Sequence, residues 1–586
     1  MAKYMIGFDE EAYMMKYHTG SAQEMYHTQL FDTDVHIIMN TSEYAADRII
    51  CDKNYELGEK IFEKVLALQD TNPESETYGL WPWYAEETLE EMERPDYNMA
   101  DFNAKAMIVS LYEAGDKLSE GIREKMYRSI EMACQCIINR NVDLGYTNVC
   151  IMDCFVACAA GELTGNEKLL NYGRNKLLQF IYYTKGKGDI AEYNSPTYTV
   201  VTINDIGDFL KYLKDEEVLR YASEINYMLW NMLAQHFDYN ILQLIGPQER
   251  AYADYVGAEF LKTIAKGCGI DYSTHPKFEI YCPGKMRDKY FEETRKNPKC
   301  PKELIPYFTG EKVYGDIRKM IIDGYNFPFF EFPKAATVRR GKGYAVGSIN
   351  KSEMWNQRRP LLGYIYDDKK DFSFRVKCYH DGFDFSAGGF HAVQDKSNIL
   401  GSINFSENRG DTHVCIDMIS GGRLVAEELK MTFEICGDTK KIKYRKENGM
   451  LILNINDVTV RINAFIKEFG KNKVEESIDI TDDMFQYSIV FYKGERKTLE
   501  LCDADIAMMA YTLEFEPTQD YVKPTFMEDG DMMNISWKPS DRELGLISPK
   551  RTFTFIKNMS EDMQLLDGEP QLNEIYKKNL QEKLFS

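Results

Sequence analysis

The residues best suited to catalysis lie in a glycine-broken loop that precedes a predicted helix. Residues 186–198 have the sequence GKGDIAEYNSPTY, so Glu192, Asn194 and Tyr198 follow one another closely. A Ser-Pro pair within this loop is suited to capping and starting a helix. Amide and phenol donors at a helix N-terminus favour binding of a carboxylate. The simpler alternative is a helix entry whose tyrosines only pack.

A second polar segment follows a Gly-Pro turn and presents Arg250 and Tyr252. Arginine binds a carboxylate or sulfate through two parallel hydrogen bonds, which lysine cannot do. A neighbouring phenol can transfer a proton. The alternative is a structural arginine paired with Glu249 or Asp254.

Two further segments add groups of the kind that bind sugars. Tyr146 and Asn148 lie just before a predicted helix rich in cysteine, and Trp83 belongs to an aromatic run around a proline. Aromatic rings stack on sugar rings, although such rings pack in protein cores equally often. These three residues are therefore candidates for substrate binding.

Three of the eight histidines lie close together in the C-terminal half: His380, His391 and His413. A histidine beside an aspartate is suited to acid–base chemistry or to metal binding. Their spacing matches no compact zinc motif, so a divalent metal is the least favoured interpretation and simple hydrogen bonding remains open. Arg358 belongs to a dense polar loop, residues 355–360, that is expected to face the N-terminal half.

Composition limits the classes of function. The chain has 586 residues, 44% of them hydrophobic, with 71 basic and 93 acidic residues and a net charge of −22. This excludes wholesale disorder and argues against a nucleic-acid partner. The acidic N-terminus does not resemble a secretory signal, and no apolar run approaches the ~20 residues that span a membrane.

Cysteine usage points to a reducing compartment. The chain has thirteen cysteines, and three of them, Cys150, Cys154 and Cys158, recur every fourth residue among apolar neighbours. This pattern is typical of a buried helix face rather than a disulfide scaffold. We therefore expect a cytoplasmic protein without a membrane partner. The sequence contains no phosphate-binding glycine loop and no Gly-x-Ser-x-Gly motif.

Hydrophobic periodicity divides the chain into two halves. Up to about residue 325 apolar residues recur at helical spacing, as in the stripe over residues 218–233. After about residue 335 the period becomes two, as over residues 485–491, with a predicted hairpin at Asn456 and Asp457. The sequence predicts helical hairpins over residues 1–330 and an antiparallel β-sandwich over residues 331–586.

Three motifs resemble the heparinase II/III-like and alginate-lyase type of polysaccharide lyases: EYNSPTY at 192–198, GPQERAY at 246–252 and HDGFDF at 380–385. The resemblance implies an incomplete (α/α) toroid followed by a β-sandwich. The chain departs from the better-known lyases at Ser195, since they carry an Asn-His pair where this sequence has Asn-Ser. That departure leaves the identity of the base open.

The resemblance also implies a function. Such lyases cleave acidic, uronate-containing glycans by β-elimination. By analogy, Asn194 and Arg250 would hold the carboxylate of the sugar, Tyr198 or Tyr252 would act as acid and base, and a histidine would approach from the sandwich. That histidine would be His391 or His380. No cofactor is implied, and homo-oligomerisation remains open.

Two other functions compete with this one. A glycoside hydrolase needs two carboxylates across the scissile bond, and the only candidates are Glu192 with Glu249 or Asp254. A carbohydrate-binding protein without catalysis is the third interpretation, prompted by the missing Asn-His pair.

Overall fold

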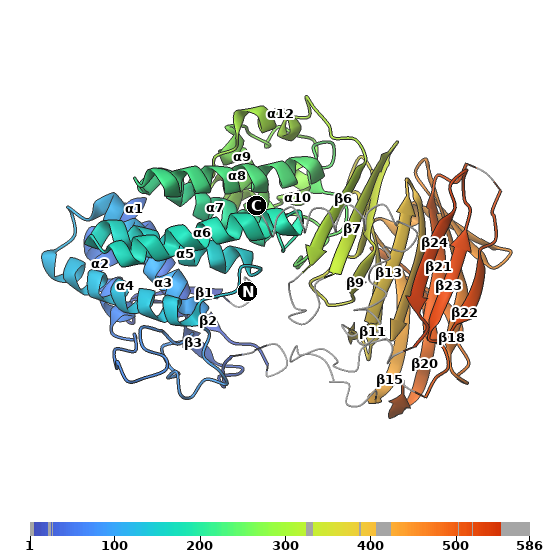
Figure 1. Cartoon of the computed structure of the whole chain (residues 1–586), viewed down its shortest axis with the longest axis horizontal. Helices are drawn as coiled ribbons and strands as arrows, with labels where there is room; N and C mark the ends of the chain where they lie inside the picture. Colours follow the sequence, from blue (N-terminus) through green and yellow to red (C-terminus); the bar gives the residue numbers. More distant parts are fainter. Residues whose placement is uncertain are drawn as a thin grey trace.

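The computed structural model consists of an N-terminal helical domain and a C-terminal domain of antiparallel sheets (Figure 1). It describes residues 5–21, 25, 27–323, 332–385, 388–405, 423–501, 503–518 and 520–551. The predicted fold class is confirmed.

The helical domain is built from hairpins of antiparallel helices. Its main helices are α1 Ile38–Ile50, α2 Tyr55–Leu66, α3 Asn98–Ala114, α4 Glu120–Arg140, α5 Thr147–Thr164, α6 Glu167–Lys187, α7 Tyr198–Tyr212, α8 Glu216–His236 and α9 Ala258–Cys268. Helices α1, α3, α5 and α7 contact one another in succession, and each also packs against the next helix in the chain. This arrangement is the expected incomplete (α/α) toroid. A small sheet of β1 Met5–Asp9, β2 Met14–His18 and β3 Asp34–His36 precedes it.

Helix α5 forms the centre of this domain. It is long and apolar enough to span a membrane by length and composition, but 83% of it is buried inside the protein. Cys150, Cys154 and Cys158 are all buried, as their spacing predicted. The helix ends at Gly165, whose φ of 69° lets the chain turn, and Asn166 caps α6 by accepting the backbone N–H of Lys168.

The C-terminal domain is a sandwich of two large antiparallel sheets. The larger sheet contains β6 Ile317–Asp323, β7 Phe332–Gly341, β8 Tyr344–Ile349, β10 Leu361–Ile365, β11 Phe372–His380, β12 Phe383–Asp384, β15 Arg423–Cys436, β19 Glu475–Ile480 and β20 Met484–Glu500. The second contains β9 Lys351–Glu353, β13 Gly388–Asp395, β14 Asn398–Phe405, β16 Ile442–Glu447, β17 Met450–Ile455, β18 Val458–Phe469 and β21 Ala507–Phe515. A third sheet of β22 Thr525–Asp529, β23 Met532–Trp537 and β24 Leu544–Pro549 packs on the second.

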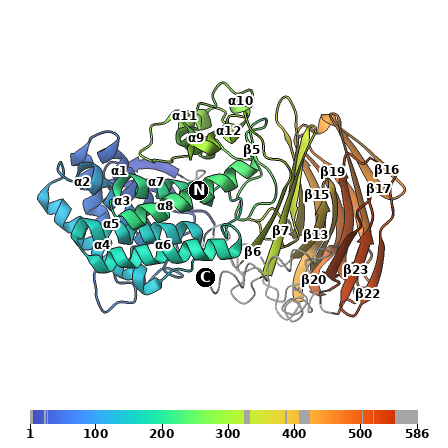
Figure 2. The ribbon, with the colours of Figure 1, turned by 45° about the horizontal axis from the view of Figure 1, so that its top comes forward.

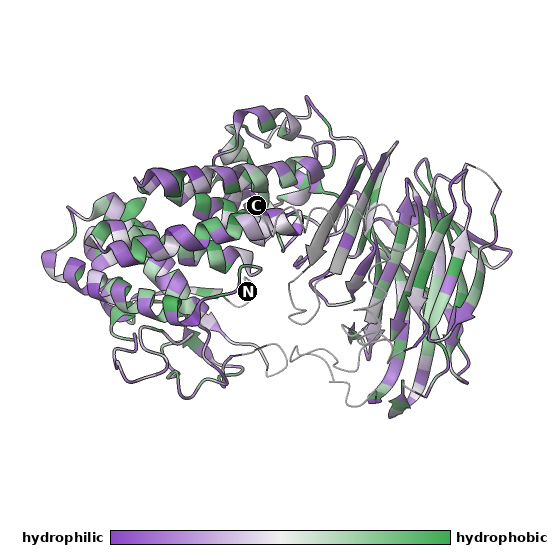
Figure 3. Ribbon diagram, in the orientation of Figure 1, coloured by the Kyte–Doolittle hydropathy of each residue, from purple (hydrophilic) through white to green (hydrophobic). Residues whose placement is uncertain are grey.

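Strand sequences account for this architecture. Apolar and polar residues alternate along many strands of the sandwich (Figure 3), and the apolar ones fill the space between the two large sheets. The predicted hairpin joins β17 to β18, with Asn456 at a φ of 52°. Strand β6 begins at Ile317, so the sheet starts before the predicted boundary at residue 330.

The outer face of the larger sheet packs against the helical domain (Figure 2). Ile241 and Ile245, which follow α8, form an apolar cluster with Val338, Leu362 and Tyr364 of the sheet. The segment that carries Arg250 begins immediately after this cluster. The contact between domains therefore fixes where that segment lies.

Candidate active site

Side chains from both predicted motifs and from the sandwich meet around Arg250. We call Arg250, Glu192, Tyr198, Tyr252 and Gln357 the Arg250 cluster. The guanidinium donates from Nη2 to the Tyr198 hydroxyl at 2.6 Å, from Nη1 to Glu192 Oε1 at 3.2 Å, and from Nε to Gln357 Oε1 at 2.7 Å. The Tyr198 and Tyr252 hydroxyls are 2.5 Å apart. Two segments distant in sequence therefore converge, as the motifs predicted.

Backbone pairing holds the Arg250 segment against the sandwich. Gln248 and Arg359 exchange two backbone hydrogen bonds of 3.0 and 2.8 Å, and the Ala251 N–H donates to the Gln357 carbonyl at 2.6 Å. Arg250 itself has a φ of 64°, in the left-handed region that bulky residues seldom adopt. This conformation turns the chain between Gln248 and Ala251, the two residues of this segment that pair with the sandwich.

The two tyrosines differ in environment. Arg250 donates to the Tyr198 oxygen and is also hydrogen-bonded to Tyr252, and either tyrosine hydroxyl can donate to the other. Burial raises the pKa of the Tyr198 phenol above its ordinary value, which keeps this phenol protonated. Tyr252 is 56% exposed. This exposure makes Tyr252 the tyrosine that a substrate can reach, and therefore the better candidate for a base.

Glu192 is a nearly inaccessible carboxylate, only 1% exposed. Burial raises its pKa to about 7, although Arg250 and the backbone N–H of Asn148 lower it in part. Near neutral pH the Glu192 carboxyl is partly protonated. In its protonated form it carries no charge and does not offset the positive charge of Arg250.

Asn194 does not lie where a substrate could reach it, which corrects the expectation that it holds the carboxylate. Its side chain is fully buried, and its amide donates to the carbonyls of Ile245 and Pro247 at 3.0 Å each. Its φ of 51° turns the side chain inward at the entry to α7. Asn194 therefore fixes the turn that precedes Arg250.

Of the predicted sugar-binding residues, Asn148 and Tyr146 lie near Glu192 and Arg250. Asn148 lies in the first turn of α5, and its Oδ1 is buried without a hydrogen-bond partner among the described residues. Tyr146 precedes it and accepts a hydrogen bond from Asn98 at 3.4 Å. The Trp83 indole donates to Asp96, which also accepts the Asn98 backbone N–H. Trp83 is thus linked to Tyr146 through Asp96 and Asn98.

Strand alternation directs His380 and His391 away from the Arg250 cluster. Phe374, Val376 and Cys378 of β11 face the interior of the sandwich, and His380 shares their side of the strand. Its Nε2 lies 2.9 Å from the Val425 carbonyl, to which it donates. His380 therefore faces the sandwich interior, and the approach that the resemblance implied for it is not supported.

The His391 side chain points away from the space between the two large sheets, on the face of the second sheet that the third sheet covers. Its neighbours Phe390 and Ala392 point into the space between the large sheets, so His391 shares the side of Val393, which packs under β24. Burial lowers the pKa of His391 to about 3. His413 lies outside the described residues. Within the described ranges no group of histidine, cysteine and acidic side chains forms a metal site.

Arg358 supports the site rather than entering it. It is 3% exposed and forms an ion pair with Glu249, which Lys334 also contacts at 3.3 Å. Its Nε also donates to Glu353 at 2.8 Å. Burial lowers the pKa of Arg358 to about 9.

Ion pairs engage both carboxylates that the hydrolase interpretation offered as partners of Glu192. Glu249 is held by Arg358 and Lys334, and Asp254 is held by Arg359 at 2.6 Å and by Arg375. Burial by itself would raise the pKa of Asp254, but the two arginines lower it below its ordinary value. Neither carboxylate is available to pair with Glu192 across a glycosidic bond.

Two contributors were missed from the sequence. Gln357 accepts the Arg250 Nε–H, and the Trp355 ring lies 5.4 Å from the Arg250 guanidinium carbon. Both belong to the polar loop from which only Arg358 was chosen. The polar composition of this loop indicated that it contributes to the site. Which of its side chains reach Arg250 is determined by the pairing of Gln248 with Arg359, which the sequence does not show.

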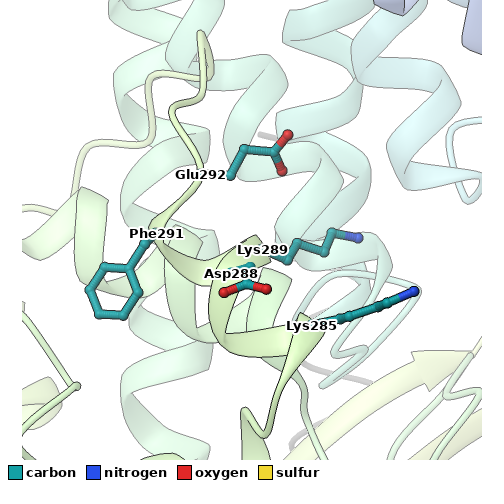
Figure 4. Close-up of a pocket in the computed structure, with 5 residues that line it drawn as sticks. All are labelled: Lys285, Asp288, Lys289, Phe291 and Glu292. Atoms are coloured by element: carbon teal, nitrogen blue, oxygen red, sulfur yellow. The ribbon is translucent and has the colours of Figure 1, made fainter. Parts of the chain in front are cut away.

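A separate surface pocket lies beside the short helix α11, Lys285–Phe291 (Figure 4). It is open, and Lys285, Asp288, Lys289, Phe291 and Glu292 line it. None of the predicted site residues lies there.

One family model matches part of the chain. Residues 12–264 match a family model described as a domain of unknown function, DUF8769. The search of curated proteins gave no match.

Solved structures give distant likenesses. The chain is similar to heparinase III, with 10% identity, a TM-score of 0.44, and coverage of 87% of this chain and 82% of that one. It is similar to a chondroitin AC lyase of Streptomyces coelicolor A3, with 8% identity, a TM-score of 0.44 and coverage of 86% and 80%. An endoglucanase CelQ of Clostridium thermocellum matches with 11% identity, a TM-score of 0.23 and coverage of 89% and 75%. Likenesses of this degree do not assign an activity.

Proposed function

We propose that the chain is a carbon–oxygen lyase that cleaves uronate-containing oligosaccharides by β-elimination. The observation that carries this proposal is the exposed Tyr252 phenol, hydrogen-bonded to Tyr198, which in turn accepts from Arg250. A phenol beside an arginine suits proton removal next to a carboxylate, because the carboxylate must be neutralised before the neighbouring carbon becomes acidic.

Each residue of the site has a separate role in the proposed reaction. The guanidinium of Arg250 binds the uronate carboxylate, and Tyr252, hydrogen-bonded to Tyr198, acts as the general base that removes the proton from C5. The electron pair forms a double bond between C4 and C5, and the bond from C4 to the bridging oxygen breaks. The departing oxygen takes its proton from the tyrosine pair. Asn148, Tyr146 and Trp83 contact the flanking sugar.

The first experiment follows the ultraviolet absorbance of the unsaturated product over a panel of uronate oligosaccharides. Replacing Tyr252 by Phe should reduce kcat by about 10²- to 10⁴-fold, the usual contribution of a general acid or base. Because Tyr252 is largely exposed, the free energy of unfolding should change by no more than about 0.5 kcal/mol. Absence of the unsaturated product across the whole panel would reject the proposal.

A carbohydrate-binding protein without catalysis is the second candidate. Asn194 is buried, so it does not supply a second hydrogen-bond donor, beside Arg250, to the carboxylate of a uronate. Calorimetric binding of a uronate oligosaccharide that Tyr252→Phe leaves unchanged, with no turnover, would favour this candidate.

A further inference from the structure

The guanidinium of Arg250 has partners from both domains. Glu192 and Tyr198 belong to the helical domain, whereas Gln357 and the Trp355 ring belong to the loop between β9 and β10 of the sandwich. The bond from Arg250 Nε to Gln357 Oε1, at 2.7 Å, fixes the end of the guanidinium opposite Glu192 and Tyr198. The plane of the guanidinium is therefore set from two sides.

The position of Gln357 depends on docking of the two domains. Gln357 accepts the Ala251 backbone N–H through its own carbonyl, and Arg359 pairs with Gln248. The buried ion pair of Arg358 with Glu249 lies between these backbone contacts in the chain. Residues 355–359 are thus fixed to the Arg250 segment by backbone bonds and by charge.

The chemical type of the residue at position 357 matters for anion binding. An amide oxygen accepts the Nε–H without adding charge, so it orients the guanidinium and leaves its positive charge intact. A carboxylate at the same place would orient the guanidinium equally well but would partly neutralise it. Glu192 already supplies one carboxylate to Arg250, and a second would compete with the carboxylate of a ligand.

We propose that Gln357 is a positioning residue through which the β-sandwich domain orients Arg250 for an anionic substrate. The inference rests on the proposed function for the identity of that anion. The orientation of the guanidinium, however, is independent of turnover.

The test compares Gln357→Glu and Gln357→Leu with Asn356→Asp, which places the same new charge one residue away. Gln357→Glu should raise KM, or the Kd for a uronate oligosaccharide measured by calorimetry, by about tenfold or more, with a change in kcat of less than about threefold. Gln357→Leu should lower kcat/KM by about 10- to 100-fold, because the guanidinium loses its orientation. Asn356→Asp should change neither constant by more than about twofold.

A merely structural role predicts a different pattern. If Gln357 only held its own loop in place, removal of the Nε acceptor in Gln357→Leu would leave kcat/KM and Kd unchanged, and that result would overturn the inference. A crystal structure of Gln357→Leu decides the same question without any activity. Loss of the contact between Arg250 and Tyr198 supports the inference, and an unmoved guanidinium overturns it. Absence of unsaturated product from the wild type would reject the proposed function, and the crystal structure would still decide the role of Gln357.

Discussion

Glu192 is the residue whose ionisation most directly affects Arg250, since the two side chains are 3.2 Å apart and Glu192 is almost completely buried. Burial raises the pKa of Glu192 to about 7. Below this pH the carboxyl is neutral, so Glu192 does not compete with an incoming carboxylate for the charge of Arg250. Above it, Glu192 becomes charged and competes for the same guanidinium.

This gives a pH prediction with a definite sign. Affinity for a uronate oligosaccharide should fall as the pH rises through about 7, because ionised Glu192 neutralises Arg250. Glu192→Gln should remove this dependence between pH 6 and 8, since the amide does not ionise. Calorimetric titrations at several pH values measure the effect. A wild-type affinity that stays constant from pH 6 to 8 would contradict it.

The same shift affects stability. A carboxyl with a raised pKa in the folded state binds its proton more tightly than in the unfolded chain. The destabilising contribution is therefore absent below about pH 4.5 and complete above about pH 7. The wild type should lose stability relative to Glu192→Gln across this window, which denaturant titrations at pH 5 and 8 would measure. A pH-independent difference between the two proteins would contradict the assignment.

At the residue scale the sequence predicted more of the site's composition than of its geometry. Glu192, Tyr198, Arg250 and Tyr252 were identified from two short motifs, and all four meet. The direction of Asn194 was missed because it depends on a left-handed backbone angle and on carbonyls more than fifty residues away. Neither feature leaves a pattern in the local sequence.

At the scale of elements, the loop before α7 depends on Asn194. Its amide satisfies two backbone carbonyls, and its left-handed conformation suits asparagine better than alanine. Asn194→Ala should lower the free energy of unfolding by about 2–4 kcal/mol, from two lost hydrogen bonds and the cost of the backbone angle. Denaturant titration measures this loss.

The control is Asn448→Ala, in the exposed turn between β16 and β17. Asn448 has the same φ of 51° as Asn194, but it is exposed. Asn448→Ala should lower the free energy of unfolding by about 1 kcal/mol, the cost of the left-handed backbone angle alone. Equal losses in the two variants would show that the buried hydrogen bonds of Asn194 contribute nothing.

Strand alternation explains why the histidines were misplaced. The period of two predicted the strands correctly, but it does not tell which face of a strand meets the helical domain. On β11, Phe374 faces the sandwich interior, while Arg375 on the other face pairs with Asp254 and Glu434. Because both faces are covered, each carries buried residues, and composition alone does not distinguish them.

At the scale of the whole molecule, the candidate site exists because two domains dock. The sequence predicted both domains from their periodicities, but the interface joins an apolar cluster to isolated charged residues that follow no period. Arg358 and Glu249 are 109 positions apart in the chain and pair across this interface. The pair carries no local signal, so only the folded chain reveals it.

Removal of one partner of this buried pair gives the last prediction. Arg358→Met leaves Glu249 with Lys334 alone, and breaking a buried pair in this way costs about 3–5 kcal/mol. The double variant Glu249→Gln with Arg358→Met should recover only part of that loss, since it removes the charge of Glu249 but still takes Arg358 from Glu353 and Glu249 from Lys334. Arg445→Met, which removes an exposed partner of Glu447, should change the free energy of unfolding by less than about 0.5 kcal/mol.

Scanning calorimetry should show the melting temperature of Arg358→Met well below those of the wild type and of Arg445→Met. Kinetics should show a loss of kcat/KM in Arg358→Met, because the segment that carries Arg250 loses its anchor on the sandwich. Equal melting temperatures and equal kcat/KM for Arg358→Met and Arg445→Met would show that this ion pair does not hold the two halves of the site together.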